Sequence, residues 1–162
     1  EGISAAGRVL KIPLKAATPK ARRTAEAMLR KYPQPRWQAA NPRQVEWEWM
    51  DAALLMSVEL DRAKSPDYRY EIQVFRIGPI ALIGLPGEPF VEGQLSIKEQ
   101  SPLALNLVAH CANGYAGYLA PRAAYDRGGH EIRHQPAQWA RLAPGSLERV
   151  VAATVGLLRK SP

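Results

Sequence analysis

Apolar positions in the first third of the chain favour one strand followed by two helices. Residues 6–14 alternate weakly between apolar and polar side chains, which is typical of a strand. Thr18-Pro19 supplies a capping residue and a first-turn proline, so a helix is predicted from there to the Pro33-Gln34-Pro35 segment. Asn41-Pro42 repeats this start signal, and apolar residues then recur at helical spacing to about Asp61. Residues 64–67 (Lys-Ser-Pro-Asp) read as a turn.

From Tyr70 the spacing changes to that of strands. Residues 70–77 and 80–83 predict two strands joined by a tight turn at Gly78-Pro79. The second run is apolar on both faces, which is typical of a central strand. A helix is expected over residues 91–100, a buried strand over 103–109, and a final helix over 146–158 with Leu147, Val150, Val151, Val155 and Leu158 facing inward. This order predicts an α/β fold, a mixed β-sheet flanked by helices.

The length and composition fit one globular domain. The chain has 162 residues, of which 46% are apolar and 23% charged, close to the averages of soluble proteins. Its single cysteine, Cys111, excludes an internal disulfide and a zinc site built from cysteines. The chain opens at Glu1 without a methionine, so we expect either a removed signal or a piece of something longer.

The net charge of +7 is concentrated at the front. Residues 1–43 hold ten basic side chains against two acidic ones, a net of +8, and the remainder sums to −1. We therefore divide the domain into a basic strand–helix–helix segment, 1–63, and a segment of strand-end motifs, 64–162. The basic segment could meet an anionic membrane surface as a non-catalytic binding module, pack on an acidic partner, or simply be a solvated face. Nucleic acid is not an expected partner, since no nucleic-acid motif accompanies the charge.

Two strand ends carry candidate chemistry. Pro86-Gly87 makes a sharp turn after the strand at 80–85 and presents Glu88, which could be a metal ligand, a general base or a helix cap. After the strand at 103–109, the loop Asn113-Gly114-Tyr115-Ala116-Gly117-Tyr118 combines glycines with tyrosine hydroxyls. Ligand sites in open α/β sheets collect at such strand ends.

His130-Glu131-Ile132-Arg133-His134 fits the H-E-x-x-H pattern of zinc peptidases. That chemistry needs a continuous helix and a third ligand. Gly128-Gly129 precedes the motif and Gln135-Pro136 closes it, so a helix is not expected there. A small metallopeptidase built on His130 and His134 is retained as an alternative function.

Residues 77–88 (IGPIALIGLPGE), the loop at 113–118 (NGYAGY), Ala124-Tyr125 and Gly129-His130-Glu131 together resemble the neutral/alkaline ceramidase family. The resemblance runs from about Tyr70 to the end of the chain, and it looks like the C-terminal part of the catalytic domain. It implies a zinc-dependent amidase in which activated water attacks the amide of an N-acyl sphingolipid. It also implies secretion or a periplasmic or cell-surface location.

The resemblance assigns Glu88 and Tyr118 as zinc ligands, with two histidines from the earlier part of the domain. Tyr125, Asn113 and Tyr115 are weaker candidates for lining the substrate pocket or shaping the loop. Neither His110 nor His130 matches a family ligand, so the expected partner is the N-terminal half of the same domain. By itself this chain is expected to be inactive, to bind zinc weakly, and to expose apolar surface on the strand at 80–85 and on residues 47–56.

Overall fold

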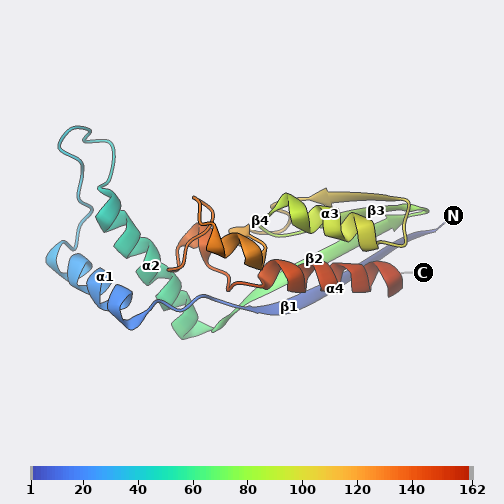
Figure 1. Cartoon of the computed structure of the whole chain (residues 1–162), viewed down its shortest axis with the longest axis horizontal. Helices are drawn as coiled ribbons and strands as arrows, with labels where there is room; N and C mark the ends of the chain where they lie inside the picture. Colours follow the sequence, from blue (N-terminus) through green and yellow to red (C-terminus); the bar gives the residue numbers. More distant parts are fainter. Residues whose placement is uncertain (1, 161–162) are drawn as a thin grey trace.

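The computed structural model describes residues 2–160 and is built around a four-stranded mixed sheet (Figure 1). The strand order is β1-β2-β3-β5. β1 (Ile3–Pro13) pairs antiparallel with β2 (Asp67–Ile77), and β2 pairs antiparallel with β3 (Ile80–Gly84). β5 (Leu105–Ala109) then runs parallel to β3. The predicted α/β fold with a mixed sheet is confirmed.

Two helices cover one face of this sheet (Figure 1). α3 (Val91–Gln100) is the crossover between the parallel strands β3 and β5, and it packs against α4 (Ser146–Lys160). α4 in turn contacts β1 and β2. The five inward positions predicted on the last helix are all buried, because its apolar residues recur along one side. The main core therefore lies between α4 and the sheet.

The other face of the sheet has apolar side chains that no layer formed by residues 2–160 covers. Phe75 on β2 is opposite Leu82 on β3, which is opposite Leu107 on β5. These three side chains are 44%, 43% and 49% exposed. β3 is central, as predicted, but only one of its faces is buried. The strand predicted over 103–109 is present as β5, but the prediction that it is buried is wrong. β5 forms the edge of the sheet, and Leu105 and Leu107 point away from the helices.

α1 (Pro19–Lys31) and α2 (Trp47–Lys64) form a helical hairpin at one end of the molecule (Figure 1). The side-chain oxygen of Thr18 accepts a hydrogen bond from the Ala21 amide at 3.2 Å, which confirms the predicted cap. The two helices bury Ala25 against Ala52 and Leu55. This packing makes the hairpin a small core of its own.

The start of the second helix at Asn41-Pro42 was predicted wrongly. Residues 37–46 instead form a loop that is closed by a short antiparallel bridge between Trp37 and Val45. The Gln38 amide donates to the Gln44 carbonyl at 2.8 Å within this loop. Asn41 accepts a hydrogen bond from the Arg43 amide, so its side chain stabilises a turn and caps no helix. α2 begins only after Glu46.

Short elements connect these layers. β4 (Glu88–Pro89) and β6 (Tyr118–Leu119) form a separate two-stranded parallel pair, and two 3-10 turns follow at Arg122–Asp126 and Gln138–Ala140. Within residues 2–160, no helix is long and apolar enough to cross a membrane.

Candidate metal centre

The turn that follows β3 and the loop that follows β5 lie against each other. The amide of Leu85 donates to the Ala109 carbonyl at 3.0 Å, and the amide of Gly87 donates to the Gly114 carbonyl at 3.1 Å. In the opposite direction, the Cys111 amide donates to the Gly87 carbonyl at 2.8 Å. This network of backbone hydrogen bonds fixes the Pro86-Gly87-Glu88 turn relative to the tyrosine loop, residues 113–118.

A buried tyrosine is hydrogen-bonded to this turn from the sheet core. Tyr70 is fully buried in the sheet core, and its hydroxyl donates to the Pro86 carbonyl at 2.9 Å. Burial raises the pKa of Tyr70 well above its usual range. Its hydroxyl therefore stays a proton donor, and it anchors the turn at every physiological pH.

Glu88 and Tyr118 are brought together, although thirty positions separate them in the sequence. They are register partners in the parallel pair formed by β4 and β6. The Glu88 amide donates to the Gly117 carbonyl at 2.9 Å, and the Phe90 amide donates to the Leu119 carbonyl at 3.0 Å. Paired residues of adjacent strands project to the same side, so the carboxylate and the phenol share one face.

Tyr115 adds a third oxygen to this pair. Its hydroxyl donates to Oε1 of Glu88 at 3.1 Å, and Tyr118 also hydrogen-bonds to Glu88. Two hydroxyls from one loop thus converge on one half-buried carboxylate. The arrangement is a cluster of side-chain oxygen atoms at a strand end.

The carboxylate of Glu88 contributes to the raised pKa of both phenols. The negative charge of Glu88 is the main cause that raises the pKa of Tyr118, ahead of desolvation and the hydrogen bond. Desolvation and then the hydrogen bond to Glu88 raise the pKa of Tyr115 to about 12. Both phenols are therefore protonated hydrogen-bond donors at neutral pH.

Sequence reasoning did not identify two neighbours of this cluster. Glu131 contributes a further negative charge that acts on Tyr118, and Cys111 lies exposed in the same loop with a left-handed φ of 51°. Gly129-His130-Glu131 entered the sequence analysis only as part of the resemblance, which did not place this segment near the tyrosines. The charge of Glu131 makes the electrostatic potential around Tyr118 more negative, which favours a cation there.

The remaining candidate residues have other surroundings. Asn113 is exposed with a φ of 58°, a conformation that asparagine tolerates, so it shapes the loop. Tyr125 packs beside a small apolar cluster, and the ammonium of Lys15 lies 5.1 Å from the centre of its ring. Burial, followed by the charge of Glu148, raises the pKa of Tyr125. A substrate-binding role for Tyr125 remains a prediction.

The H-E-x-x-H segment is not a metal site. Residues 130–134 form an irregular loop, in which the ring of His130 stacks on Trp139 at 5.6 Å and His134 is exposed. Within residues 2–160, no three His, Cys, Asp or Glu side chains are placed to hold a metal ion. The metallopeptidase alternative is wrong, because the glycine pair and the proline leave no helix to align the two imidazoles.

The same loop instead connects the hairpin to the rest of the chain. Arg133 donates to the Asp51 carboxylate on α2, and its guanidinium lies 5.7 Å from the centre of the Trp47 ring. Gln135 accepts a hydrogen bond from the Thr18 amide at 3.0 Å. The segment therefore has a structural role.

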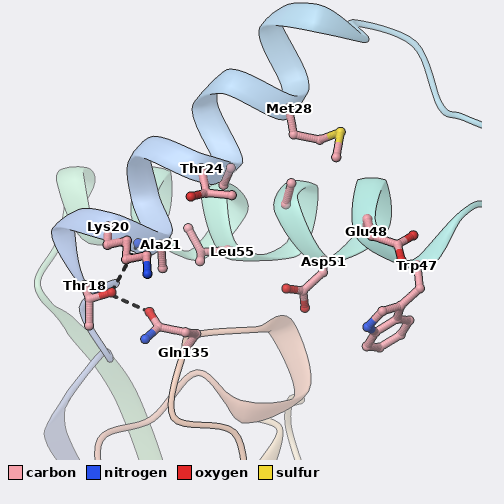
Figure 2. A pocket seen from close by; sticks show the side chains of 12 residues that line it. Thr18, Lys20, Ala21, Thr24, Met28, Trp47, Glu48, Asp51, Leu55 and Gln135 are labelled. Atoms are coloured by element: carbon pink, nitrogen blue, oxygen red, sulfur yellow. Dashed lines mark hydrogen bonds between the residues drawn. The ribbon is translucent and has the colours of Figure 1, made fainter.

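A cavity of about 520 Å³ opens between α1 and α2, bounded below by Gln135 (Figure 2). Its walls are mainly apolar, with Lys20 toward the Thr18 end and Glu48 beside Trp47 at the other. Neither Glu88 nor Tyr118 lines it. Trp47 is 49% exposed at its mouth, as expected for apolar surface on residues 47–56.

Comparison with solved structures identifies the fold. The chain is similar to a structure described as a ceramidase complexed with C2, with a TM-score of 0.55 and 13% identity over 98% of this chain and 30% of that chain. It is also similar to the neutral ceramidase of Pseudomonas aeruginosa, with a TM-score of 0.53 and 15% identity over 98% of this chain and 28% of that one.

The class that these structures define is a ceramidase-like α/β fold. The chain spans less than a third of the length of either ceramidase, so the likeness concerns one part of that fold. No family model matches the sequence, and no curated protein is similar to it in sequence.

Proposed function

We propose that this chain is the C-terminal portion of a zinc-dependent, ceramidase-like amide hydrolase. The observation that supports the proposal is the register pairing of Glu88 with Tyr118, the two residues that the sequence resemblance assigns as zinc ligands. The ceramidase-like fold provides independent support, because it extends over 98% of the chain. The proposed substrate is an N-acyl sphingolipid or a related N-acyl compound.

The donor set fits one half of a zinc site. A carboxylate and a phenol, both oxygen ligands, lie on one side of a rigid turn, and Glu88 is accessible enough to coordinate. Catalytic zinc sites use at least three protein ligands, and residues 2–160 provide no such group of His, Cys, Asp and Glu side chains. We therefore propose that the N-terminal half of the domain supplies two histidines.

Zinc bound there would supply Lewis acidity and lower the pKa of a coordinated water. The residues of this chain would then bind and orient. Glu88 would give a negatively charged ligand, held in place by its own backbone amide. Tyr115 would donate a hydrogen bond to Oε1 of Glu88, which would fix which carboxylate oxygen faces the site. The β4–β6 pair would keep Tyr118 beside Glu88 in every state.

Zinc content and amidase activity test this proposal in the full-length parent protein. Glu88→Gln and Tyr118→Phe are each expected to lower bound zinc and activity by about 10-fold or more, as loss of a metal contact does. Glu92→Gln is a matched control, since Glu92 is an exposed carboxylate in the first turn of α3. Unchanged zinc content and activity in both test variants would refute the assignment.

Zinc titration of the 162-residue chain alone gives a second test. With two of four proposed ligands, it is expected to bind zinc weakly and to show no amidase activity. Tight binding that survives Glu88→Ala but is lost in His130→Ala would contradict the proposal.

A further inference from the structure

The connection between α1 and α2 is the part of the hairpin farthest from the sheet (Figure 1). The hairpin leaves the sheet at Thr18 and returns at Lys64, so residues 30–46, from the last two positions of α1 to the residue before α2, form its distal tip. The start of β1 and the end of α4 lie at the opposite end of the molecule (Figure 1). The tip is thus an exposed projection that no other part of the described chain covers.

An exposed tryptophan is fixed at this tip. Trp37 is 54% exposed, although tryptophan is among the side chains most stabilised by burial. Its backbone bridges Val45, and the Glu46 amide donates to the Arg36 carbonyl at 2.7 Å. The indole of Trp49, farther back, donates to the Tyr32 carbonyl at 2.8 Å and ties the tip to α2. Trp37 is therefore presented to the surroundings by an ordered hairpin.

The tip that carries this tryptophan is rich in basic residues. Residues 30–46 contain four Lys and Arg against one Glu, a net of +3. That glutamate, Glu46, is already paired with Arg36 at 3.0 Å. Arg30, Lys31 and Arg43 are exposed and have no ion-pair partner within residues 2–160. The excess charge is therefore available to an anionic partner.

The apolar side of α1 is not the binding element. Ala21, Ala25 and Met28 face α2 and the small core of the hairpin. An exposed indole and unpaired basic residues on one protruding tip match the chemistry of a bilayer interface, where tryptophan sits at headgroup level and basic residues meet anionic lipid. A nucleic-acid surface would instead need several aromatic side chains for successive bases, and the tip presents one exposed indole.

We propose that the distal tip of the α1–α2 hairpin is a peripheral membrane-binding surface for anionic phospholipid. Trp37 enters the interfacial region, and Arg30, Lys31 and Arg43 contact the headgroup phosphates. Each basic residue near an anionic surface strengthens binding by roughly fivefold. The surface does not include Glu88 or Tyr118. The membrane-binding proposal therefore goes beyond the proposed hydrolase and is tested independently of it.

Co-sedimentation of the protein with vesicles tests this inference. The wild type is expected to bind phosphatidylcholine vesicles that contain phosphatidylglycerol, to bind pure phosphatidylcholine much more weakly, and to lose affinity as salt is added. Arg30→Gln/Lys31→Gln is expected to weaken binding to the anionic vesicles by roughly 30-fold. Trp37→Ala is expected to weaken binding to both kinds of vesicle.

Two matched variants control for charge and for exposed aromatic surface. Lys64→Gln/Lys98→Gln removes the same charge from exposed sites outside the tip, and Phe75→Ala removes an aromatic ring that is 44% exposed on the sheet. Both are expected to bind like the wild type. Equal effects of the tip and control variants, equal binding to both vesicle compositions, or binding to poly(U) RNA in place of vesicles would each overturn the inference. Failure here with normal zinc results would leave the hydrolase proposal intact.

Discussion

A β-carbon at Gly87 would overlap the carbonyl oxygen of Gly117. Gly87 also has a φ of 73°, in the left-handed region. Gly117 is equally constrained, since a β-carbon there would lie 2.6 Å from the Trp139 carbonyl oxygen. The close contact of these two glycines is what allows Glu88 and Tyr118 to become strand partners.

Gly87→Ala should therefore separate the two loops. We expect a loss of unfolding free energy of roughly 2–4 kcal/mol, from backbone strain together with the displaced carbonyl. Urea denaturation measures it. Gly78→Ala is the control, because Gly78 also has a positive φ of 55° but nothing lies within 4 Å of its added β-carbon. That variant should lose only about 1 kcal/mol, and equal losses would show that the loop contact contributes nothing.

Replacing the Glu88 carboxylate should make the neighbouring phenols more acidic. The charge of Glu88 is the main cause of the raised pKa of Tyr118 and contributes to that of Tyr115. Glu88→Gln is expected to lower both pKa values toward the ordinary 10.0. NMR titration of the tyrosine ring carbons measures them, with Tyr118→Phe for assignment. If Glu92→Gln shifts them as much, the carboxylate contact is not the cause.

Lys15 should make stability depend on alkaline pH. Its ammonium is buried and donates to the Arg133 carbonyl, and desolvation lowers its pKa from 10.5 to about 8. Between these values the unfolded chain binds the extra proton, so unfolding free energy should rise as pH increases from 8 toward 10. Above that, the raised pKa values of the tyrosines act in the opposite direction, because the folded state retains their protons.

The Lys15→Met variant isolates this contribution. It retains most of the buried aliphatic volume and should lack the rise in stability between pH 8 and 10. The full shift corresponds to about 3 kcal/mol at most. Thermal unfolding across that pH range provides the measurement, and parallel curves for the two proteins would rule out Lys15 as the source.

The ion pair between Arg133 and Asp51 should hold the 127–136 loop on the hairpin. The side chains are 20% and 34% exposed, and the Arg133 guanidinium also lies 5.5 Å from the centre of the Trp139 ring. Asp51→Asn leaves that partly buried charge without its carboxylate, at an expected cost of about 1–3 kcal/mol. Asp61→Asn, which removes a 4.0 Å contact to Arg141 at a 43% exposed side chain, should cost under about 0.5 kcal/mol. Hydrogen exchange of the loop amides should increase only in the first variant.

The open face of the sheet should promote self-association of the isolated chain. Contiguous apolar side chains on Phe75, Leu82 and Leu107 favour contact with a second apolar surface. Leu107→Thr is expected to reduce concentration-dependent association in sedimentation velocity while changing stability by less than about 0.5 kcal/mol. Ile83→Thr, on the buried face of the neighbouring strand, should cost about 2 kcal/mol or more. Unchanged association in Leu107→Thr would contradict this role of the face.

Local signals in the sequence determined most of the secondary structure. Thr18-Pro19 specified the start of α1, Gly78-Pro79 specified the turn between β2 and β3, and the apolar spacing after Ser146 specified α4 and its buried side. These features depend on residues a few positions apart, so the chain encodes them directly. The Asn41-Pro42 signal failed because Asn41 serves a helix cap and a turn equally well, and the pairing of Trp37 with Val45 selects the turn.

Only the tertiary structure decided which strand faces are buried and which side chains contact one another. An apolar run such as residues 103–109 does not reveal whether both faces are covered, because burial depends on the layers that pack against it. The resemblance named Glu88 and Tyr118, but their pairing required the parallel register of β4 and β6 and the contact between Gly87 and Gly117. The hydrogen bond from Tyr115 to Glu88 and the charge of Glu131 near Tyr118 join segments far apart in the chain. Such contacts follow from the packing of the whole domain, which no local pattern specifies.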